Sequence, residues 1–254
     1  DTRMINRFLF YPRGGEHIPK SSNQVRTLLI PVENGIFIGG KCHVIDHNAP
    51  SILFFHGNGE IVSDYDDFAP FFLELGFNFI PVDYRGYGFS SGTPSVTSMM
   101  HDCHIIFKFI TEWLDNEHMY CSLIVMGRSL GSASALEIAR HYQQKTVALI
   151  IDSGFAYTGP LLENLGIPLE AIGFCEEEGL GNIKKIMTYK KAVLIIHAEN
   201  DEIIDVSEAR LLYEKCPAID KKLLIIPYAG HNDLFINGEV EYLKSLKWLK
   251  QKVI

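Results

Sequence analysis

Short apolar runs recur along the chain and alternate with amphipathic stretches of helical period. The runs have the length and the Ile, Val, Leu and Phe content of buried strands. They cover residues 25–32, 36–45, 51–55, 77–82, 123–126, 147–151, 192–196 and 223–226. Apolar stripes at helical spacing predict helices over 65–75, 97–115, 133–140, 206–215 and 239–250.

The order of these elements predicts an α/β fold with a mostly parallel sheet. Asn34-Gly35 lies between the first two runs and is a strong signal for an antiparallel hairpin. After this N-terminal hairpin, strands alternate with helices, so we expect helices on both faces of the central sheet. No linker, low-complexity tract or repeat interrupts the 254 residues, which predicts one domain over 1–254.

Two segments do not follow this alternation. Residues 1–20 contain the apolar stretch Phe8-Leu9-Phe10-Tyr11-Pro12, which we expect to pack as an arm on the edge of the domain. Residues 154–191 carry glycines, prolines and the acidic run Glu176-Glu177-Glu178 without a clear period. We expect 154–191 to form a small cap segment that sets the size of the substrate.

Net charge, the length of the apolar runs and the cysteine pattern limit the classes of partner and the compartment that we expect. The formal net charge of −8 argues against nucleic acid or an anionic membrane surface as the main partner. No apolar run has transmembrane length, so no integral membrane segment is expected. Scattered cysteines without metal-ligand spacing predict reduced thiols and a cytoplasmic location. These are Cys42, Cys103, Cys121, Cys175 and Cys216. The pattern says nothing about oligomeric state.

The candidate nucleophile is Ser129, in Gly127-Arg128-Ser129-Leu130-Gly131. A strand is expected just before this motif and a helix just after it, which is the context of a nucleophile elbow. Small residues are needed at the glycines because the serine occupies a strained turn. An ordinary strand-to-helix turn of an α/β domain is the alternative.

A serine hydroxyl needs an adjacent base, and the base needs an orienting carboxylate. His231 follows the last expected strand and Asp201 the penultimate one, so both fall at the edge where Ser129 lies. Asp205 and Asp152 are alternative acids. Asp205 is expected to cap the next helix, and Asp152 ends an earlier strand. Asp233 is too close to His231 in sequence to orient it.

An oxyanion hole needs two backbone amides that point at the developing charge. The amide of Leu130, directly after the nucleophile, is one candidate. The second is the amide of Asn58, in the loop His56-Gly57-Asn58-Gly59 after the strand at 51–55. We interpret His56 as a structural residue that braces this loop.

Taken together, these motifs resemble those of the α/β-hydrolase superfamily, and the match covers nearly the whole chain. They include His56-Gly57-Asn58-Gly59, Asp83-Tyr84-Arg85-Gly86-Tyr87-Gly88, the Ser129 motif, His197…Asp201 and Gly230-His231-Asn232-Asp233. Within the superfamily, the chain is similar to the small serine-hydrolase branch that includes protein depalmitoylases and related membrane-associated esterases. His197-Ala198 departs from the usual His-Gly before the acid, and 154–191 is unlike a large lipase lid.

The resemblance implies the α/β-hydrolase fold and esterase-type acyl transfer through an acyl-enzyme, with no metal or organic cofactor. Ser129, Asp201 and His231 would be the triad, and Asn58 and Leu130 the oxyanion donors. The segment from Asp83 to Gly88 would be mainly structural. We therefore expect a serine hydrolase of small-molecule or acyl carboxylic esters, with thioesters as a further class. The alternatives are a serine peptidase or amidase of the same fold and a non-catalytic binding member.

Overall fold

The computed structural model describes residues 3–22, 24–119 and 122–253, with the side chains of residues 3 and 4 left undescribed. It divides into two compact units, residues 1–124 (unit 1) and residues 125–254 (unit 2). We describe each unit by itself. The expectation of one domain over 1–254 stays a prediction.

Unit 1 is built around β1 (Val25–Glu33), β2 (Ile36–His43), β3 (Ser51–Phe55) and β4 (Asn78–Val82), in the order β1-β2-β4-β3. β2 runs antiparallel to both β1 and β4, and β3 is parallel to β4. Gly35 has a φ of 75° and turns β1 into β2, as the Asn34-Gly35 signal predicted. The N-terminal hairpin is therefore confirmed.

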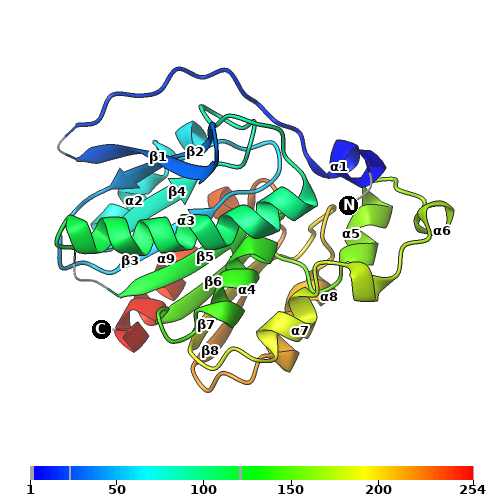
Figure 1. Ribbon diagram of the computed structural model, residues 1–254. Coiled ribbons are helices and arrows are strands. Elements are labelled where there is room, and N and C mark those ends of the chain that lie inside the picture. Colours follow the sequence, from blue (N-terminus) through cyan, green and yellow to red (C-terminus); the bar gives the residue numbers. More distant parts are fainter. Residues whose placement is uncertain (1–2, 23, 120–121, 254) are drawn as a thin grey trace. The chain divides into compact units, whose positions relative to one another are not determined.

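Helical elements lie on both faces of the unit 1 strands. They are the 3₁₀ turn η1 (Val62–Tyr65), α2 (Ala69–Glu74) and α3 (Val96–Asn116), and unit 1 also contains the short helix α1 (Arg3–Leu9). Successive residues of β3 show the two faces, because side chains alternate along a strand. Phe54 contacts the rings of Tyr65 and Phe79, whereas Phe55 lines a small cavity with Ile106 of α3. α3 crosses in front of these strands in Figure 1.

Unit 2 continues with β5 (Leu123–Arg128), which begins at the end of unit 1, then β6 (Ala148–Asp152), β7 (Ala192–Ala198) and β8 (Lys221–Ile226). β6, β7 and β8 are parallel neighbours. α4 (Gly131–His141) packs on β6, and α8 (Val206–Lys215) and α9 (Leu234–Val253) pack on β7 and β8. In Figure 1, α9 lies behind these strands and α4 in front. The mostly parallel α/β arrangement is confirmed.

The segment 154–191 holds four short helical elements that the sequence pattern did not reveal. They are α5 (Thr158–Asn164), α6 (Leu169–Ile172), the 3₁₀ turn η2 (Glu176–Glu178) and α7 (Asn182–Ile186). Carboxylates hold the entry to α5. Glu208 of α8 accepts the amides of Ala156 and Tyr157, and Glu176 accepts those of Thr158 and Gly159, at 2.7–2.9 Å. The first turn of α5 therefore has its amides satisfied.

Three expected helix boundaries were wrong. The helix expected over 65–75 is interrupted, because Pro70 in the first turn of α2 has no N–H and its ring prevents a continuous helix through it. α3 begins at Val96, one residue before the expected start at Thr97, and is capped by the Ser95 side chain, which accepts the amide of Ser98. α9 begins at Leu234, and the non-helical Gly238 (φ −130°) bends it near Ile226.

α1 was not predicted, but the arm after it packs as expected within unit 1. Leu9 and Phe10 are buried. Gly14 pairs with Gly88, and the amide of Gly88 donates to the Arg13 carbonyl at 2.8 Å. The arm is thus fixed to the glycine-rich loop that follows β4.

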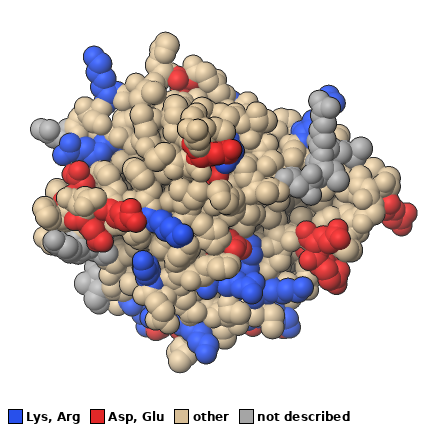
Figure 2. Space-filling view, in the orientation of Figure 1, with Lys and Arg blue, Asp and Glu red and all other residues tan. Residues whose placement is uncertain are grey.

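Among the described residues, no helix has both the length and the apolar character required to cross a bilayer. The described cysteines form no disulfide with one another, and Cys121 lies outside the described residues. On the face shown in Figure 2, Lys and Arg side chains lie interspersed with Asp and Glu. The expectations about compartment and nucleic acid stay predictions.

Candidate active site

Ser129 sits in a strained turn between β5 and α4. Its φ is 51°, a left-handed conformation that is unfavourable for a side chain and typical of functional positions. The amide of Ser129 donates to the Asp152 carbonyl at the end of β6, at 2.8 Å. A Cβ on Gly127 would overlap the carbonyl oxygen of Gly131, which explains why the turn requires a glycine at 127.

The structure brings Ser129, His231 and Asp201 together within unit 2. Ser129 Oγ lies 3.0 Å from His231 Nε2, and His231 Nδ1 lies 2.7 Å from Asp201 Oδ2. The residues are 8%, 3% and 8% exposed, so the chain of contacts is shielded while the serine keeps a small accessible surface. A serine hydroxyl, an imidazole and a carboxylate therefore lie in hydrogen-bond sequence.

The loop after β7 keeps Asp201 ionised. Its Oδ1 accepts the amides of Ile203 and Ile204 at 3.0 and 2.7 Å. Burial by itself would raise the pKa of Asp201, but the His231 ring and the Ile204 amide outweigh burial and hold that pKa below its usual value. A carboxylate in this state only accepts hydrogen bonds, so the proton of neutral His231 resides on Nδ1. Nε2 is then free to accept the Ser129 hydroxyl.

The other candidate acids are committed to different partners. Asp205 caps α8 by accepting the Ser207 amide at 2.9 Å, as expected. Asp233 accepts the Gly230 amide at 2.7 Å. Asp152 accepts the hydroxyl of Tyr242 at 2.7 Å. Among these aspartates, only Asp201 has a contact of its carboxylate with the His231 ring in the described structure.

Sequence reasoning assigned no role to two neighbours of this group. His197 Nε2 lies 2.8 Å from the Ile204 carbonyl and 3.3 Å from Asp201 Oδ2. Burial lowers the pKa of His197, so it acts as a neutral donor behind the acid rather than as its salt-bridge partner. Arg128 Nη2 donates to the carbonyl of His231 at 2.8 Å. Its position beside the nucleophile was the only available signal.

The two expected oxyanion donors belong to different units. Leu130 is the N-cap of α4, where helix geometry leaves the first amides without a partner inside the helix. In unit 1, Asn58 Oδ1 accepts the amide of Tyr11 at 2.8 Å and the hydroxyl of Tyr87 at 2.7 Å. The role of both amides stays a prediction.

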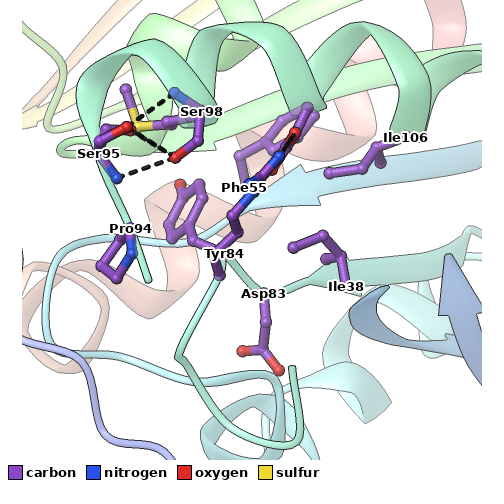
Figure 3. A pocket seen from close by; sticks show the side chains of 11 residues that line it. Ile38, Phe55, Asp83, Tyr84, Pro94, Ser95, Ser98 and Ile106 are labelled. Atoms are coloured by element: carbon purple, nitrogen blue, oxygen red, sulfur yellow. Dashed lines mark hydrogen bonds and ion pairs between the residues drawn. The ribbon is translucent and has the colours of Figure 1, made fainter. Parts of the chain in front are cut away.

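The loop that contains Asn58 is held from several sides. Tyr84 Oη donates to the His56 carbonyl at 2.7 Å, and Glu60 accepts the Gly57 amide at 2.6 Å. The buried His56 ring lies 3.2 Å from Asp83 Oδ1 through Nε2. Asp83 and Tyr84 also line the small cavity below α3 in Figure 3. The segment after β4 thus serves as a support for the loop, in line with its expected structural role.

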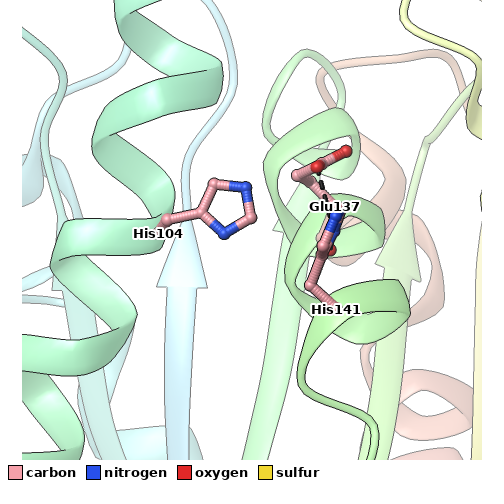
Figure 4. Close-up of side chains that lie close together, drawn as sticks. All are labelled: His104, Glu137 and His141. Atoms are coloured by element: carbon pink, nitrogen blue, oxygen red, sulfur yellow. Dashed lines mark hydrogen bonds and ion pairs between the residues drawn. The ribbon is translucent and has the colours of Figure 1, made fainter.

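Glu137 and His141 of α4, which are residue types that can bind metals, contact each other, and Glu137 also pairs with a lysine. His141 Nδ1 lies 3.0 Å from Glu137 Oε1, one turn away (Figure 4). The second carboxylate oxygen of Glu137 lies 2.7 Å from Lys185 Nζ of α7. This ion pair between Lys185 and Glu137 favours a structural role for the cluster, because it connects α7 to α4.

Comparison with known sequences shows a family match and several proteins that are similar to this chain. Residues 46–168 match the family described as serine aminopeptidase, S33. The α/β hydrolase domain-containing protein 17C of Xenopus tropicalis is 31% identical over 204 residues, which cover 78% of this chain and 60% of the relative. Protein 17B of Homo sapiens is 31% identical over 207 residues, which cover 78% of this chain and 65% of the relative. The chain thus spans less than two thirds of the length of these relatives.

Solved structures share the fold at low sequence identity. An esterase of Pyrococcus furiosus superposes with a TM-score of 0.73 and 16% identity, covering 94% of this chain and 98% of that one. Est1E of Butyrivibrio proteoclasticus gives a TM-score of 0.71 and 16% identity, covering 89% and 98%. The sequence relatives and this shared fold agree with the strand order and the elbow geometry. The chain therefore has the α/β-hydrolase fold.

Proposed function

We propose that this chain is a serine hydrolase that cleaves carboxylic esters, with thioesters as a second substrate class. The observation that carries the proposal is the hydrogen-bond sequence Ser129 Oγ–His231 Nε2 at 3.0 Å and His231 Nδ1–Asp201 Oδ2 at 2.7 Å. These are the distances over which a base activates a serine hydroxyl and an acid orients the base.

In the proposed reaction, the Ser129 hydroxyl proton passes to His231 Nε2 while Oγ bonds to the acyl carbon. The carbonyl electrons move to oxygen, and the amides of Leu130 and Asn58 stabilise that oxyanion. Collapse of the tetrahedral intermediate breaks the bond to the leaving alcohol or thiol, which takes the proton from His231. Water then gives a proton to His231 Nε2 as its oxygen bonds to the acyl carbon, the bond from that carbon to Ser129 Oγ breaks, and His231 returns the proton to Oγ, which releases the acid and free Ser129. Ionised Asp201 stabilises the imidazolium in both halves.

Labelling with a fluorophosphonate probe tests the proposal directly, because the probe reacts with an activated serine and releases fluoride. We expect the parent protein to label and Ser129→Ala to remain unlabelled. The matched control is Ser132→Ala, since Ser132 is buried on α4 and its hydroxyl has no hydrogen-bond partner among the described residues. Labelling of Ser129→Ala at the parent rate would contradict the assignment.

Substrate class is tested by turnover. A p-nitrophenyl ester series from acetate to palmitate, a matched acyl thioester and an aminoacyl p-nitroanilide distinguish esterase, thioesterase and peptidase activity. We expect ester hydrolysis, and a fall in kcat for Ser129→Ala of about 10³- to 10⁶-fold. The match to the serine aminopeptidase family makes a peptidase the second candidate. Cleavage of the anilide in preference to every ester would favour it.

A further inference from the structure

Arg128 connects the nucleophile to the base through the main chain. It is the last residue of β5 and directly precedes Ser129. Its Nη2 donates a 2.8 Å hydrogen bond to the carbonyl oxygen of His231, which lies 103 residues further along the chain. The residue beside the proposed nucleophile thus holds the backbone of the residue whose ring faces that nucleophile.

Apart from the contact of the His231 ring with Ser129 Oγ, the other hydrogen bonds of the His231 loop among the described residues do not reach the β5–α4 turn. The amide of His231 donates to Glu202 Oε2 at 3.1 Å, and its ring contacts Asp201. The Asn200 amide donates to the Ala229 carbonyl at 2.9 Å. All three contacts fix His231 to the loop after β7, and none sets its distance from the β5–α4 turn. The Arg128 hydrogen bond does so.

The guanidinium of Arg128 lies near the group of residues that supports the Ser129 turn. Arg128 is half-buried, and its positive charge acts on the buried hydroxyl of Tyr242. Tyr242 donates to the Asp152 carboxylate, and the carbonyl of Asp152 accepts the Ser129 amide. Arg128 therefore lies near Tyr242 and Asp152, the residues that support the turn at Ser129.

We propose that Arg128 is a positioning residue, whose guanidinium holds the His231 carbonyl and thereby sets the separation between Ser129 Oγ and His231 Nε2. The inference rests on the proposed hydrolase function and deepens it. Guanidinium is suited to this task because its donors form a rigid planar fork, whereas a lysine offers one mobile ammonium group. A misplacement of reacting groups by about 1 Å can cost about 100-fold in rate.

Four variants test the proposal: Arg128→Ala, Arg128→Lys, the control Arg210→Ala and Ser129→Ala. Arg210 is an exposed arginine of α8 in the same unit. We expect Arg128→Ala to lower kcat for p-nitrophenyl acetate by about 10- to 100-fold with little change in KM. Added guanidinium at sub-denaturing concentration should restore part of that kcat and leave Arg210→Ala unchanged. Arg128→Lys, which keeps the charge and the stem, should retain intermediate kcat.

A second readout does not depend on turnover. The proton on His231 Nδ1, bonded to Asp201, gives a low-field resonance in the ¹H NMR spectrum when the ring is held still. We expect this resonance to broaden or disappear in Arg128→Ala and to persist in Arg210→Ala. Circular dichroism and the melting temperature show that each variant is folded. If Arg128→Ala does not fold, Arg128→Lys provides both readouts.

The outcomes separate the two proposals. An active parent with unchanged kcat in both Arg128 variants overturns the positioning role alone. A rise in KM at constant kcat, without guanidinium rescue, also overturns it, because it indicates a substrate contact. A parent no more reactive than Ser129→Ala overturns the proposed hydrolase function. In that case the resonance still decides whether Arg128 positions the ring.

Discussion

Tyr242 Oη donates a 2.7 Å hydrogen bond to Asp152 Oδ2, so the carboxylate at the end of β6 is bound to α9 and not to His231. The two residues are 5% exposed or less. Burial and the nearby Asp152 charge raise the pKa of Tyr242 well above its usual value, so the phenol stays protonated and donates. Asp152 thus has a structural partner, which supports the proposal that Asp201 is the acid for the histidine.

This distinction predicts different effects for two isosteric changes. Asp201→Asn should lower kcat by about 10⁴-fold, because an amide cannot stabilise the imidazolium and favours the wrong tautomer. Asp152→Asn should keep most of the turnover, since its amide oxygen can still accept from Tyr242. Steady-state kinetics with p-nitrophenyl acetate compare them. Equal losses in both variants would contradict the assignment of Asp201.

The nucleophile turn predicts a strong effect at Gly127. In Gly127→Ala, the added Cβ overlaps the Gly131 carbonyl, and backbone cannot move aside cheaply. We expect a loss of more than about 3 kcal/mol in the free energy of unfolding, or no folded protein. Gly166→Ala is the control, because Gly166 has a φ of 79° but open space around it. Its loss should stay near 1–2 kcal/mol, the approximate cost of a left-handed residue.

Urea denaturation of both glycine variants measures this difference. Similar losses would contradict the prediction, because Gly127 has no left-handed φ and the overlap with Gly131 is the reason given for its larger loss.

The contacts of Glu176 with the first amides of α5 predict a local effect when its charge is removed. Glu176→Gln removes the negative charge at the N-terminus of α5 and weakens the bonds to the amides of Thr158 and Gly159. We expect opening of residues 154–191 to become about fivefold more frequent, which corresponds to about 1 kcal/mol. Limited proteolysis with mapped cleavage sites measures it. Glu177→Gln, an exposed neighbour, should behave like the parent.

Stability should depend on pH through His43 of β2. The residue is 4% exposed, and burial lowers its pKa in the folded state. Below about pH 6.5, the pKa of an unperturbed histidine, the unfolded chain binds a proton that the folded protein does not. The contribution of neutral, buried His43 to the free energy of unfolding is therefore fully present above about pH 6.5 and is lost as the pH falls.

Urea denaturation at pH 7.5 and pH 5.5 tests this effect. His43→Gln should reduce the difference in unfolding free energy between the two pH values, whereas His17→Gln, at an exposed position, should not. His197 has the same direction of pKa shift, also through burial, so some pH dependence should remain in His43→Gln. An unchanged pH dependence in His43→Gln would contradict the prediction.

Local signals were sufficient for the strands and for the group around Ser129. Each strand is a short apolar run, and Ser129, Asp201 and His231 all follow such runs, so topology alone predicted that they would meet. The sequence favoured Asp201 among the aspartates, but it could not show the partners of the others, because a hydrogen bond such as Tyr242 to Asp152 joins residues 90 positions apart. The contact from Arg128 to His231 has the same long-range origin.

The segment 154–191 shows where periodicity fails. Its helices span 7, 4 and 5 residues, too short for an apolar stripe to repeat. They are stabilised by distant groups instead, such as Glu208 on the amides before α5. α1 was missed for a related reason, since its 7 residues span only about two turns, too few for an apolar stripe to be recognised.

The arm from Phe10 to Glu16 has a practical consequence for anyone who divides this chain. A fragment that begins at β1 would contain every strand of unit 1, yet it would lack the Tyr11 amide that fixes Asn58 Oδ1. It would also lack Arg13, which donates to the Gly59 carbonyl at 3.1 Å and is paired with Asp64. Such a fragment is expected to fold with its Asn58 loop held by fewer contacts, so activity measured on it would differ from that of the whole chain.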